Sequence, residues 1–161
     1  MVKKDHIRLF KTEEKDLNVF FQFQLDEEAR YMAAFMPKDS GDITAYMEKW
    51  KKILADPEIN MCTIKVDGEI TGSISKFVME GEAEITYWID RKFWGQGIAT
   101  TAMKAFLEME KTRPIFGRVA FDNYGSQKVL EKGGFKKIGV DKGFANARQA
   151  EIVEFIYKLD A

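Results

Sequence analysis

The sequence has very little cysteine, histidine or proline, with one, one and three residues among 161. The lone cysteine, Cys62, excludes a disulfide framework and any zinc site built on several cysteines. It lies in an apolar, strand-like run that is typical of a small buried thiol. Because His6 is the only histidine and lies near the N-terminus, catalysis built on histidine is not expected. No metal is expected either.

Neither sign of charge dominates, and no hydrophobic run is long. The formal net charge is −1, so nothing draws the whole chain to nucleic acid or to an anionic membrane. No apolar run approaches the length of about 18 residues that a membrane-spanning helix needs, and the sequence shows no signal-peptide pattern. These absences predict a cytoplasmic protein with no nucleic-acid partner and no membrane partner.

What is present fits one domain, 1–161, with an ordinary apolar content of 45%. Apolar spacing and capping residues predict helices after Thr12, over Glu27–Met36, Ile43–Ala55, Ala99–Met109 and Ser126–Lys132. Runs of β-branched and aromatic residues between turns predict strands over His6–Phe10, Asn60–Val66, Glu69–Val78, Glu84–Ile89, Phe116–Phe121, Phe135–Val140 and Ala150–Leu159. A polar loop is expected over Lys142–Gln149.

The order of these elements predicts a mixed α/β fold. A strand, a helix and a strand in succession imply a parallel pair joined by a right-handed crossover. The preceding strands form an antiparallel series, with Asp67-Gly68 as a hairpin turn. The expected sheet has six or seven strands.

Residues 94–99, Trp-Gly-Gln-Gly-Ile-Ala, lie between a strand and a long helix. The two glycines let the backbone turn tightly and approach a ligand closely. The helix that follows offers unpaired N–H groups and a partial positive charge at its N-terminus. This segment is therefore a candidate phosphate or pyrophosphate site.

Two other phosphate-binding motifs are possible alternatives. A Walker loop needs a Gly-Lys-Ser/Thr sequence, which this turn lacks. A dinucleotide fingerprint needs a third glycine at a later fixed place, where this helix has already begun. Asp122 ends the next strand, as the fingerprint's acidic residue would, and so keeps dinucleotide binding open.

A second segment, Phe121–Phe135, contains Asn-Tyr-Gly-Ser at 123–126 and ends in Gly-Gly-Phe. Together with the turn at 94–99, it resembles the GNAT superfamily of acetyl-CoA-dependent N-acetyltransferases. The match covers Glu84 to about Ile138. Trp-Gly-Gln-Gly and Asn-x-x-Ser are most similar to the branch of ribosomal-protein alanine N-acetyltransferases.

The resemblance implies a GNAT-like sheet with helices on both faces and two splayed central parallel strands. It also implies acetyl-CoA as the donor and CoA as the product, with no metal. Main chain near Trp88 and Ile89 is expected to pair with the pantetheine arm, and an amide there to polarise the thioester carbonyl. The implied cofactor-binding residues are Trp88, Ile89, Trp94, Gly95, Gln96, Gly97, Ile98, Ala99, Thr100, Asn123 and Ser126.

Many members of the family protonate the departing thiolate with a tyrosine seven residues after the asparagine, where this chain has Leu130. In the branch that it resembles, the serine three residues after the asparagine takes that place, here Ser126, with Tyr124 as a second candidate. Glu84 is the expected general base. Simpler roles stay open: a helix cap for Asn123, a helix-start serine for Ser126 and a solvated hairpin end for Glu84.

The acceptor is expected to be a primary amine, either on a peptide or protein N-terminus or on a small molecule, that attacks directly in a ternary complex. In the family, the helices after the first strand cover the acceptor site. Candidate acceptor-binding residues are therefore Tyr31, Phe35 and Met36, with plain core packing as the alternative. Phe144 and Arg148 are candidates for the opposite wall. A homodimer is compatible with the resemblance. Because the usual tyrosine is missing, a non-catalytic acyl-CoA-binding sensor or interaction module is the second functional hypothesis.

Overall fold

Seven strands form one mixed sheet in the computed structural model, which describes residues 2–161. Their order is β1-β2-β3-β4-β5-β7-β6, and every pair of neighbours is antiparallel except β4 with β5. The strands are β1 (Ile7–Lys11), β2 (Asn60–Val66), β3 (Glu69–Met79), β4 (Glu82–Ile89), β5 (Ile115–Ala120), β6 (Lys136–Ala145) and β7 (Ala150–Leu159).

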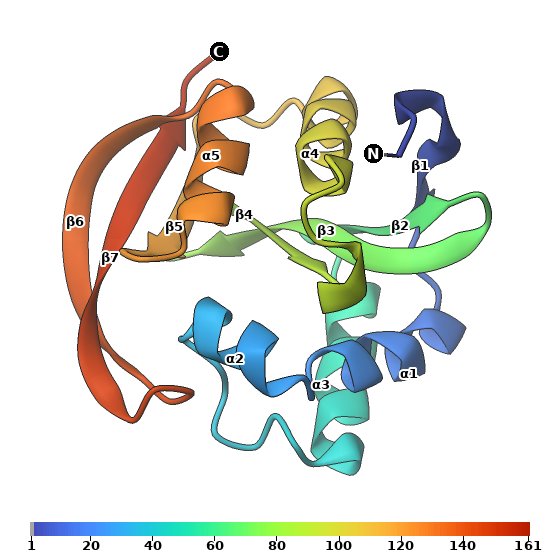
Figure 1. Cartoon of the computed structure of the whole chain (residues 1–161), viewed down its shortest axis with the longest axis horizontal. Coiled ribbons are helices and arrows are strands. Elements are labelled where there is room, and N and C mark those ends of the chain that lie inside the picture. Colours follow the sequence, from blue (N-terminus) through green and yellow to red (C-terminus); the bar gives the residue numbers. More distant parts are fainter. Residues whose placement is uncertain (1) are drawn as a thin grey trace.

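Helices cover both faces of the sheet, as predicted (Figure 1). On one face lie α4 (Ile98–Met109) and α5 (Tyr124–Lys132). On the other lie α1 (Glu14–Phe23), α2 (Glu27–Ala33) and α3 (Ile43–Ala55). Short 3₁₀ turns occupy Lys4–His6 and Arg91–Phe93. None of the helices described is long and apolar enough to cross a membrane.

Side-chain caps explain where the helices on the second face begin. Asp42 accepts hydrogen bonds from the N–H groups of Thr44 and Ala45, which confirms the predicted helix Ile43–Ala55. Asp26 caps α2 in the same way through the N–H of Ala29.

The predicted helix Glu27–Met36 is too long. It ends at Ala33, because Ala34 adopts a φ of 67° that no α-helix allows. The N–H of Phe35 then donates to the Ala33 carbonyl at 2.7 Å and closes a tight three-residue turn. Phe35 and Met36 consequently follow the helix rather than form part of it.

The predicted loop Lys142–Gln149 is also too long. β6 continues to Ala145, which pairs with Ala150 across a tight turn. The main-chain ladder with β7 holds this polar stretch extended, and such tertiary pairing outweighs weak local strand propensity.

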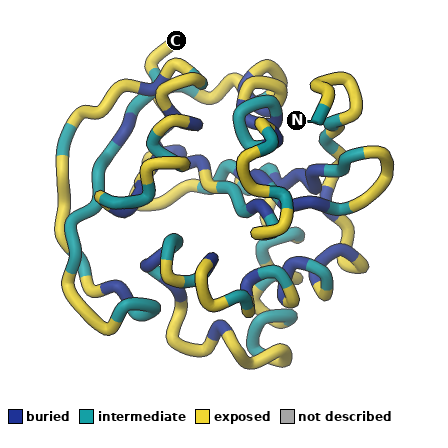
Figure 2. The backbone as a smooth tube through the Cα atoms, viewed as in Figure 1, coloured by how far each residue is buried: buried dark blue, intermediate teal, exposed yellow. Residues whose placement is uncertain are grey.

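The main core lies between the sheet and α4. Ile98, Met103 and Phe106 of α4 pack against the strands with at most 1% of their surface exposed. Figure 2 shows that buried residues are concentrated in the central strands, whereas β6 at the sheet edge is mostly exposed. The centre of the sheet thus forms the core together with α4.

β4 and β5 separate soon after they meet. Their parallel register covers Ala83 with Ile115 and Glu84 with Phe116, yet β4 continues to Ile89 and β5 to Ala120. Main-chain groups of both strands therefore face a gap rather than each other beyond Glu84. The predicted splay of the central parallel strands is confirmed.

Candidate active site

The N-terminus of α4 is a set of unpaired amides at the end of β4. Gly95 and Gly97 have φ angles of 75° and 77°, in the left-handed region that favours glycine. The first intrahelical bond runs from the Thr101 N–H to the Gly97 carbonyl at 3.1 Å, so the N–H groups of residues 98–100 precede the helical ladder. Within residues 2–161 no side chain caps this end. The amides are thus available to an anion.

Two side chains of the turn fold back on the protein. The Trp94 indole N–H donates to the Ile89 carbonyl at 2.8 Å, and the Gln96 amide donates to the Lys92 carbonyl at 3.4 Å. The first contact holds the turn against the end of β4, and the second holds it against the 3₁₀ turn Arg91–Phe93. The turn therefore presents main-chain rather than side-chain donors.

At the end of β4, the main-chain N–H and C=O groups of successive residues point alternately toward β3 and toward the gap. The Asp90 N–H donates to the Thr71 carbonyl of β3 at 2.9 Å. Because main-chain polar groups alternate along a strand, Trp88 also faces β3, whereas Tyr87 and Ile89 face the gap. The Ile89 carbonyl already accepts from Trp94, which leaves its N–H as the donor directed into the gap. Of the two residues expected to pair with the pantetheine arm, Ile89 directs its main-chain N–H into the gap, whereas the main chain of Trp88 faces β3.

Asn123 connects α5 to α2. Its side-chain oxygen accepts from the Ser126 N–H at 3.3 Å, and its amide donates to the Met32 carbonyl at 3.3 Å. Asn123 is therefore a helix cap, and it also fixes α2 beside the start of α5.

Ser126 lies within 2.8 Å of the Tyr87 hydroxyl, so this hydrogen bond joins α5 to β4. Burial raises the pKa of Tyr87, which keeps its phenol protonated. Tyr87 is not among the predicted site residues, although its position three residues after Glu84 on the same strand predicts that its side chain lies on the opposite face of the sheet. Tyr124, the second candidate donor, is 66% exposed on the first turn of α5.

Glu84 is 8% exposed and lies at the last paired position before the strands part. Burial raises the pKa of its carboxyl group, the Arg118 guanidinium opposes that shift, and nearby Glu154 adds to it. The Arg118 Nε is 3.7 Å from Glu84, and its Nη1 is 2.7 Å from Glu154. Glu84 is thus a buried, partly neutralised carboxyl group rather than a solvated hairpin end.

Arg148 is fully engaged by the protein. Its two terminal nitrogens bind the two Asp122 oxygens at 2.7 and 2.8 Å, and its Nε donates to the Tyr31 carbonyl at 2.8 Å. The guanidinium also stacks 4.2 Å from the centre of the Tyr31 ring. With only 5% of its side chain exposed, Arg148 clamps the β6–β7 turn to α2 and to the start of α5.

The other candidate acceptor residues lie in different surroundings. Phe35 lies against Gly143 of β6, and Met36 is 8% exposed, so both pack inward. Phe144, next to Gly143, points to the opposite face of β6 and is 57% exposed. Tyr31 is 51% exposed, so it and Phe144 are the accessible members of the four.

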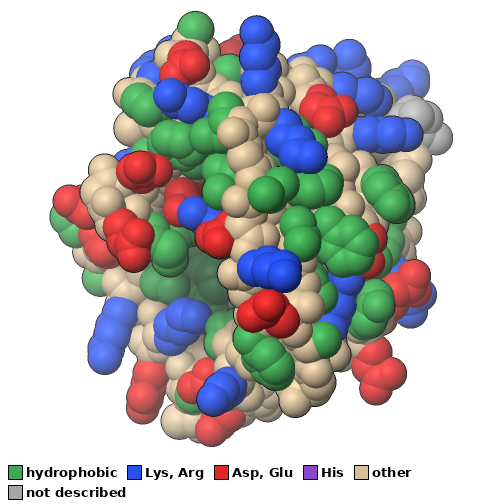
Figure 3. All heavy atoms as spheres, turned by 90° about the vertical axis from the view of Figure 1, so that its left-hand side faces the viewer, with side chains coloured by type: hydrophobic (Ala, Val, Ile, Leu, Met, Phe, Trp, Pro, Cys, Tyr) green, Lys and Arg blue, Asp and Glu red, His purple; other side chains and the backbone are tan. Residues whose placement is uncertain are grey.

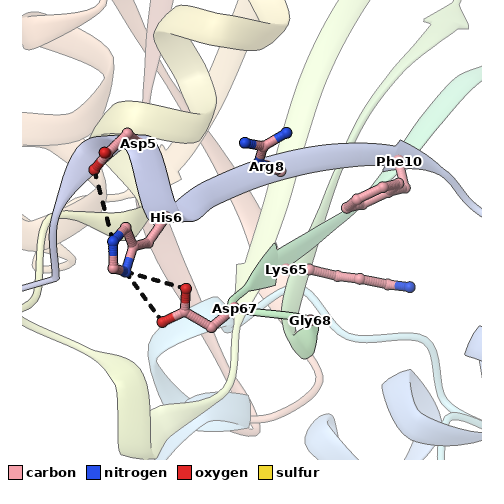
Figure 4. Close-up of a pocket in the computed structure, with 7 residues that line it drawn as sticks. All are labelled: Asp5, His6, Arg8, Phe10, Lys65, Asp67 and Gly68. Carbon is pink, nitrogen blue, oxygen red and sulfur yellow. Dashed lines mark hydrogen bonds and ion pairs between the residues drawn. The ribbon is translucent and has the colours of Figure 1, made fainter.

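Figure 3 shows the β6 side of the molecule, which is hollowed near its centre with apolar side chains inside and charged side chains around it. A second depression of about 350 Å³ lies at the outer edge formed by β1 and β2 (Figure 4). There His6 pairs with Asp67 at 3.1 Å. Because β2 and β3 separate β1 from β4, this depression is remote from the gap.

Comparison with known proteins agrees with this geometry. Residues 6–136 match the family described as "Acetyltransferase (GNAT) domain". The probable N-acetyltransferase YjcK of Bacillus subtilis (strain 168) is 34% identical over 108 residues, which cover 61% of this chain. The chain spans only 58% of the length of that relative.

Solved structures show the same fold at low identity. The microcin C7 self-immunity acetyltransferase MccE, in complex with acetyl-CoA and AMP, is 18% identical with a TM-score of 0.81, over 98% of this chain and 93% of that one. The ribosomal-protein-S5-alanine acetyltransferase of Vibrio fischeri is 15% identical with a TM-score of 0.76, over 96% and 93% of the two chains.

Proposed function

Because the chain belongs to the GNAT acetyltransferase family, we propose that it transfers the acetyl group of acetyl-CoA to a primary amine by direct attack in a ternary complex. The observation that carries the proposal is the position of the unpaired N–H groups at the start of α4, here called the amide cradle. The turn that precedes them is held against the end of β4, beside the gap between β4 and β5. Residues 98–100 supply unpaired N–H groups for a pyrophosphate, and Tyr87 and Ile89 supply an unpaired strand edge for the pantetheine arm.

Acetyl transfer needs a neutral amine, a hydrogen-bond donor to the thioester oxygen and a hydrogen-bond donor to the departing sulfur. Acetyl-CoA supplies an activated acyl group when bound. Glu84 takes a proton from the incoming ammonium through water, since burial raises the pKa of its carboxyl group toward that task. The Ile89 N–H polarises the thioester carbonyl. Ser126, at the positive N-terminus of α5, donates a hydrogen bond to the sulfur.

The acceptor reaches Glu84 from the face that carries α1, α2 and α3. Glu84 and Arg118 interact there, and Tyr31 lies at the accessible end of α2. The ribosomal-protein-S5-alanine acetyltransferase is named for a protein acceptor. The proposal covers a peptide or protein N-terminus as well as a small amine. Phe35, Met36 and Arg148 shape this side of the molecule through packing rather than through free polar groups.

A thiol-release assay tests the proposal. Purified protein with acetyl-CoA is expected to release free CoA only when an amine or an N-terminal peptide from a broad panel is present. Ser126→Ala is expected to lower the rate on the order of 10²-fold, as loss of a transition-state donor does. The alternative, an acyl-CoA-binding module, rests on buried Leu130 in place of the usual tyrosine. Tight CoA binding with no amine-dependent thiol release would favour it.

A further inference from the structure

Tyr87 has a hydroxyl group with no role in the scheme above. It lies on β4, where its side chain reaches the face covered by α4 and α5 and packs against the main core. Its oxygen is 2.8 Å from the Ser126 Oγ. This contact joins the two elements that border the gap, because β4 forms one side of it and α5 begins just after β5 ends.

The two hydroxyl groups are not equivalent. A phenol is a stronger acid than an aliphatic alcohol, so the favourable arrangement has Tyr87 donating and Ser126 accepting. Burial raises the pKa of Tyr87 and thereby keeps the donor protonated. The Ser126 N–H is meanwhile held by Asn123 at 3.3 Å, so the backbone of the serine is fixed as well.

A serine hydroxyl that accepts a hydrogen bond has its own proton directed elsewhere. Its remaining freedom is rotation of one O–H bond, and Tyr87 occupies one lone pair. Acceptance of a hydrogen bond also polarises the hydroxyl group and makes it a better donor. Both effects favour donation by Ser126 to a third atom.

We propose that Tyr87 is a positioning residue for acetyl transfer: its hydroxyl orients Ser126 so that the serine O–H points at the departing sulfur. This inference rests on the proposed function. In the step concerned, the amine lone pair forms the C–N bond and the C–S bond breaks with its electron pair remaining on sulfur. Glu84 has taken the ammonium proton through water before the attack, and the proton that the nitrogen loses after the C–N bond forms leaves to solvent water. Ser126, held by Tyr87, stabilises the thiolate by a hydrogen bond, and the thiolate takes a proton from solvent after release.

A double-mutant cycle tests the proposal. Tyr87→Phe removes one oxygen and is expected to lower kcat about tenfold, as weakening of one transition-state donor does. The KM for acetyl-CoA should stay within about twofold, because the phenol does not bind the cofactor. In a Ser126→Ala background, Tyr87→Phe should have no further effect, since the tyrosine acts through the serine.

Tyr157→Phe is the matched control. Tyr157 is 2% exposed and its hydroxyl donates to Glu131 at 3.1 Å, in the same core but away from Ser126. This variant should retain wild-type kcat. The dissociation constant for CoA and the melting temperature show that each variant is folded.

The outcomes separate this inference from the proposed function. Amine-dependent thiol release with a wild-type kcat in Tyr87→Phe overturns the inference and leaves the proposed function intact. A tenfold loss of equal size with and without Ser126 also overturns it, because a merely structural effect is additive. Absence of thiol release by the wild-type protein with every amine overturns the proposed function itself, and the inference with it.

Discussion

Glu84 and Tyr87 lie three residues apart on β4 and point to opposite faces of the sheet. Glu84 meets Arg118 on the face of α1–α3, whereas Tyr87 meets Ser126 on the face of α4 and α5. The proposed base is thus separated by one strand from the hydroxyl pair that is proposed to face the sulfur. In the proposed function the acyl group passes between them, where β4 and β5 have parted.

Glu84→Gln should cause a loss of activity that depends on pH. The wild-type carboxylate removes the ammonium proton below the pKa of an N-terminal amine, which is about 7.7–8.0. The variant has to bind amine that is already neutral. We expect kcat/KM to fall about tenfold at pH 7, where only about a tenth of such an amine is neutral, and little at pH 9. A loss of equal size at both pH values would contradict the base role.

The fall of the wild-type kcat/KM at low pH, the acid limb of its pH profile, tests the pKa of the same carboxyl group. Burial raises the pKa of the Glu84 carboxyl group in the folded protein. A base with a raised pKa is protonated, and inactive, at higher pH than an ordinary glutamate. The acid limb of kcat/KM should therefore lie above the ordinary value of about 4.3. The acid limb should disappear from the pH profile of Glu84→Gln. An acid limb that persists in this variant would show that another group causes it.

Gly97→Ala should weaken acetyl-CoA binding. Its φ of 77° costs a residue with a Cβ about 1–2 kcal/mol, so the turn would relax away from the observed cradle. We expect KM for acetyl-CoA to rise about tenfold, the equivalent of 1.4 kcal/mol. Gly41→Ala is the matched control, because an added Cβ there meets nothing within 4 Å. An unchanged KM in Gly97→Ala would show that this turn does not hold the cofactor.

Arg148→Ala should destabilise the protein. The substitution removes the bidentate ion pair with Asp122 and the hydrogen bond that ties the β6–β7 turn to α2. The free energy of unfolding should fall by about 2 kcal/mol, the value of hydrogen bonds to charged groups. Denaturant unfolding measures the change, and Lys142→Ala, which removes an exposed pair with Glu151 at 4.0 Å, is the neutral control. Unchanged stability with a raised KM for the acceptor would instead restore Arg148 as a substrate-binding residue.

Leu130→Tyr should not create the tyrosine donor of other family members. Leu130 is 4% exposed, and its Cδ2 lies 2.8 Å from the position that a Cβ on Gly117 would take. A larger ring at this position overpacks the core and should cost about 1–3 kcal/mol of stability, whereas Leu130→Met should cost less. A folded Leu130→Tyr protein with a raised kcat would show that the position still accepts a proton donor.

The sequence predicted the elements whose signals are local. Asp42 identified the start of α3, and the glycines at 95 and 97 identified the turn before α4. The end of α2 was missed because nothing local signals that Ala34 adopts a positive φ. The clamp of Arg148 on Asp122 and the pair of Tyr87 with Ser126 join residues 26 and 39 positions apart, and the topology alone brings them together.

The most direct test of the central claim uses acetyl-CoA labelled in its acetyl group, with an accepted amine. If the chain transfers acetyl by direct attack, label should appear on the acceptor nitrogen in equal molar amount to the CoA thiol released, and both should fall together in Ser126→Ala. Thiol released without label on the acceptor, or label retained on the protein, would contradict this account.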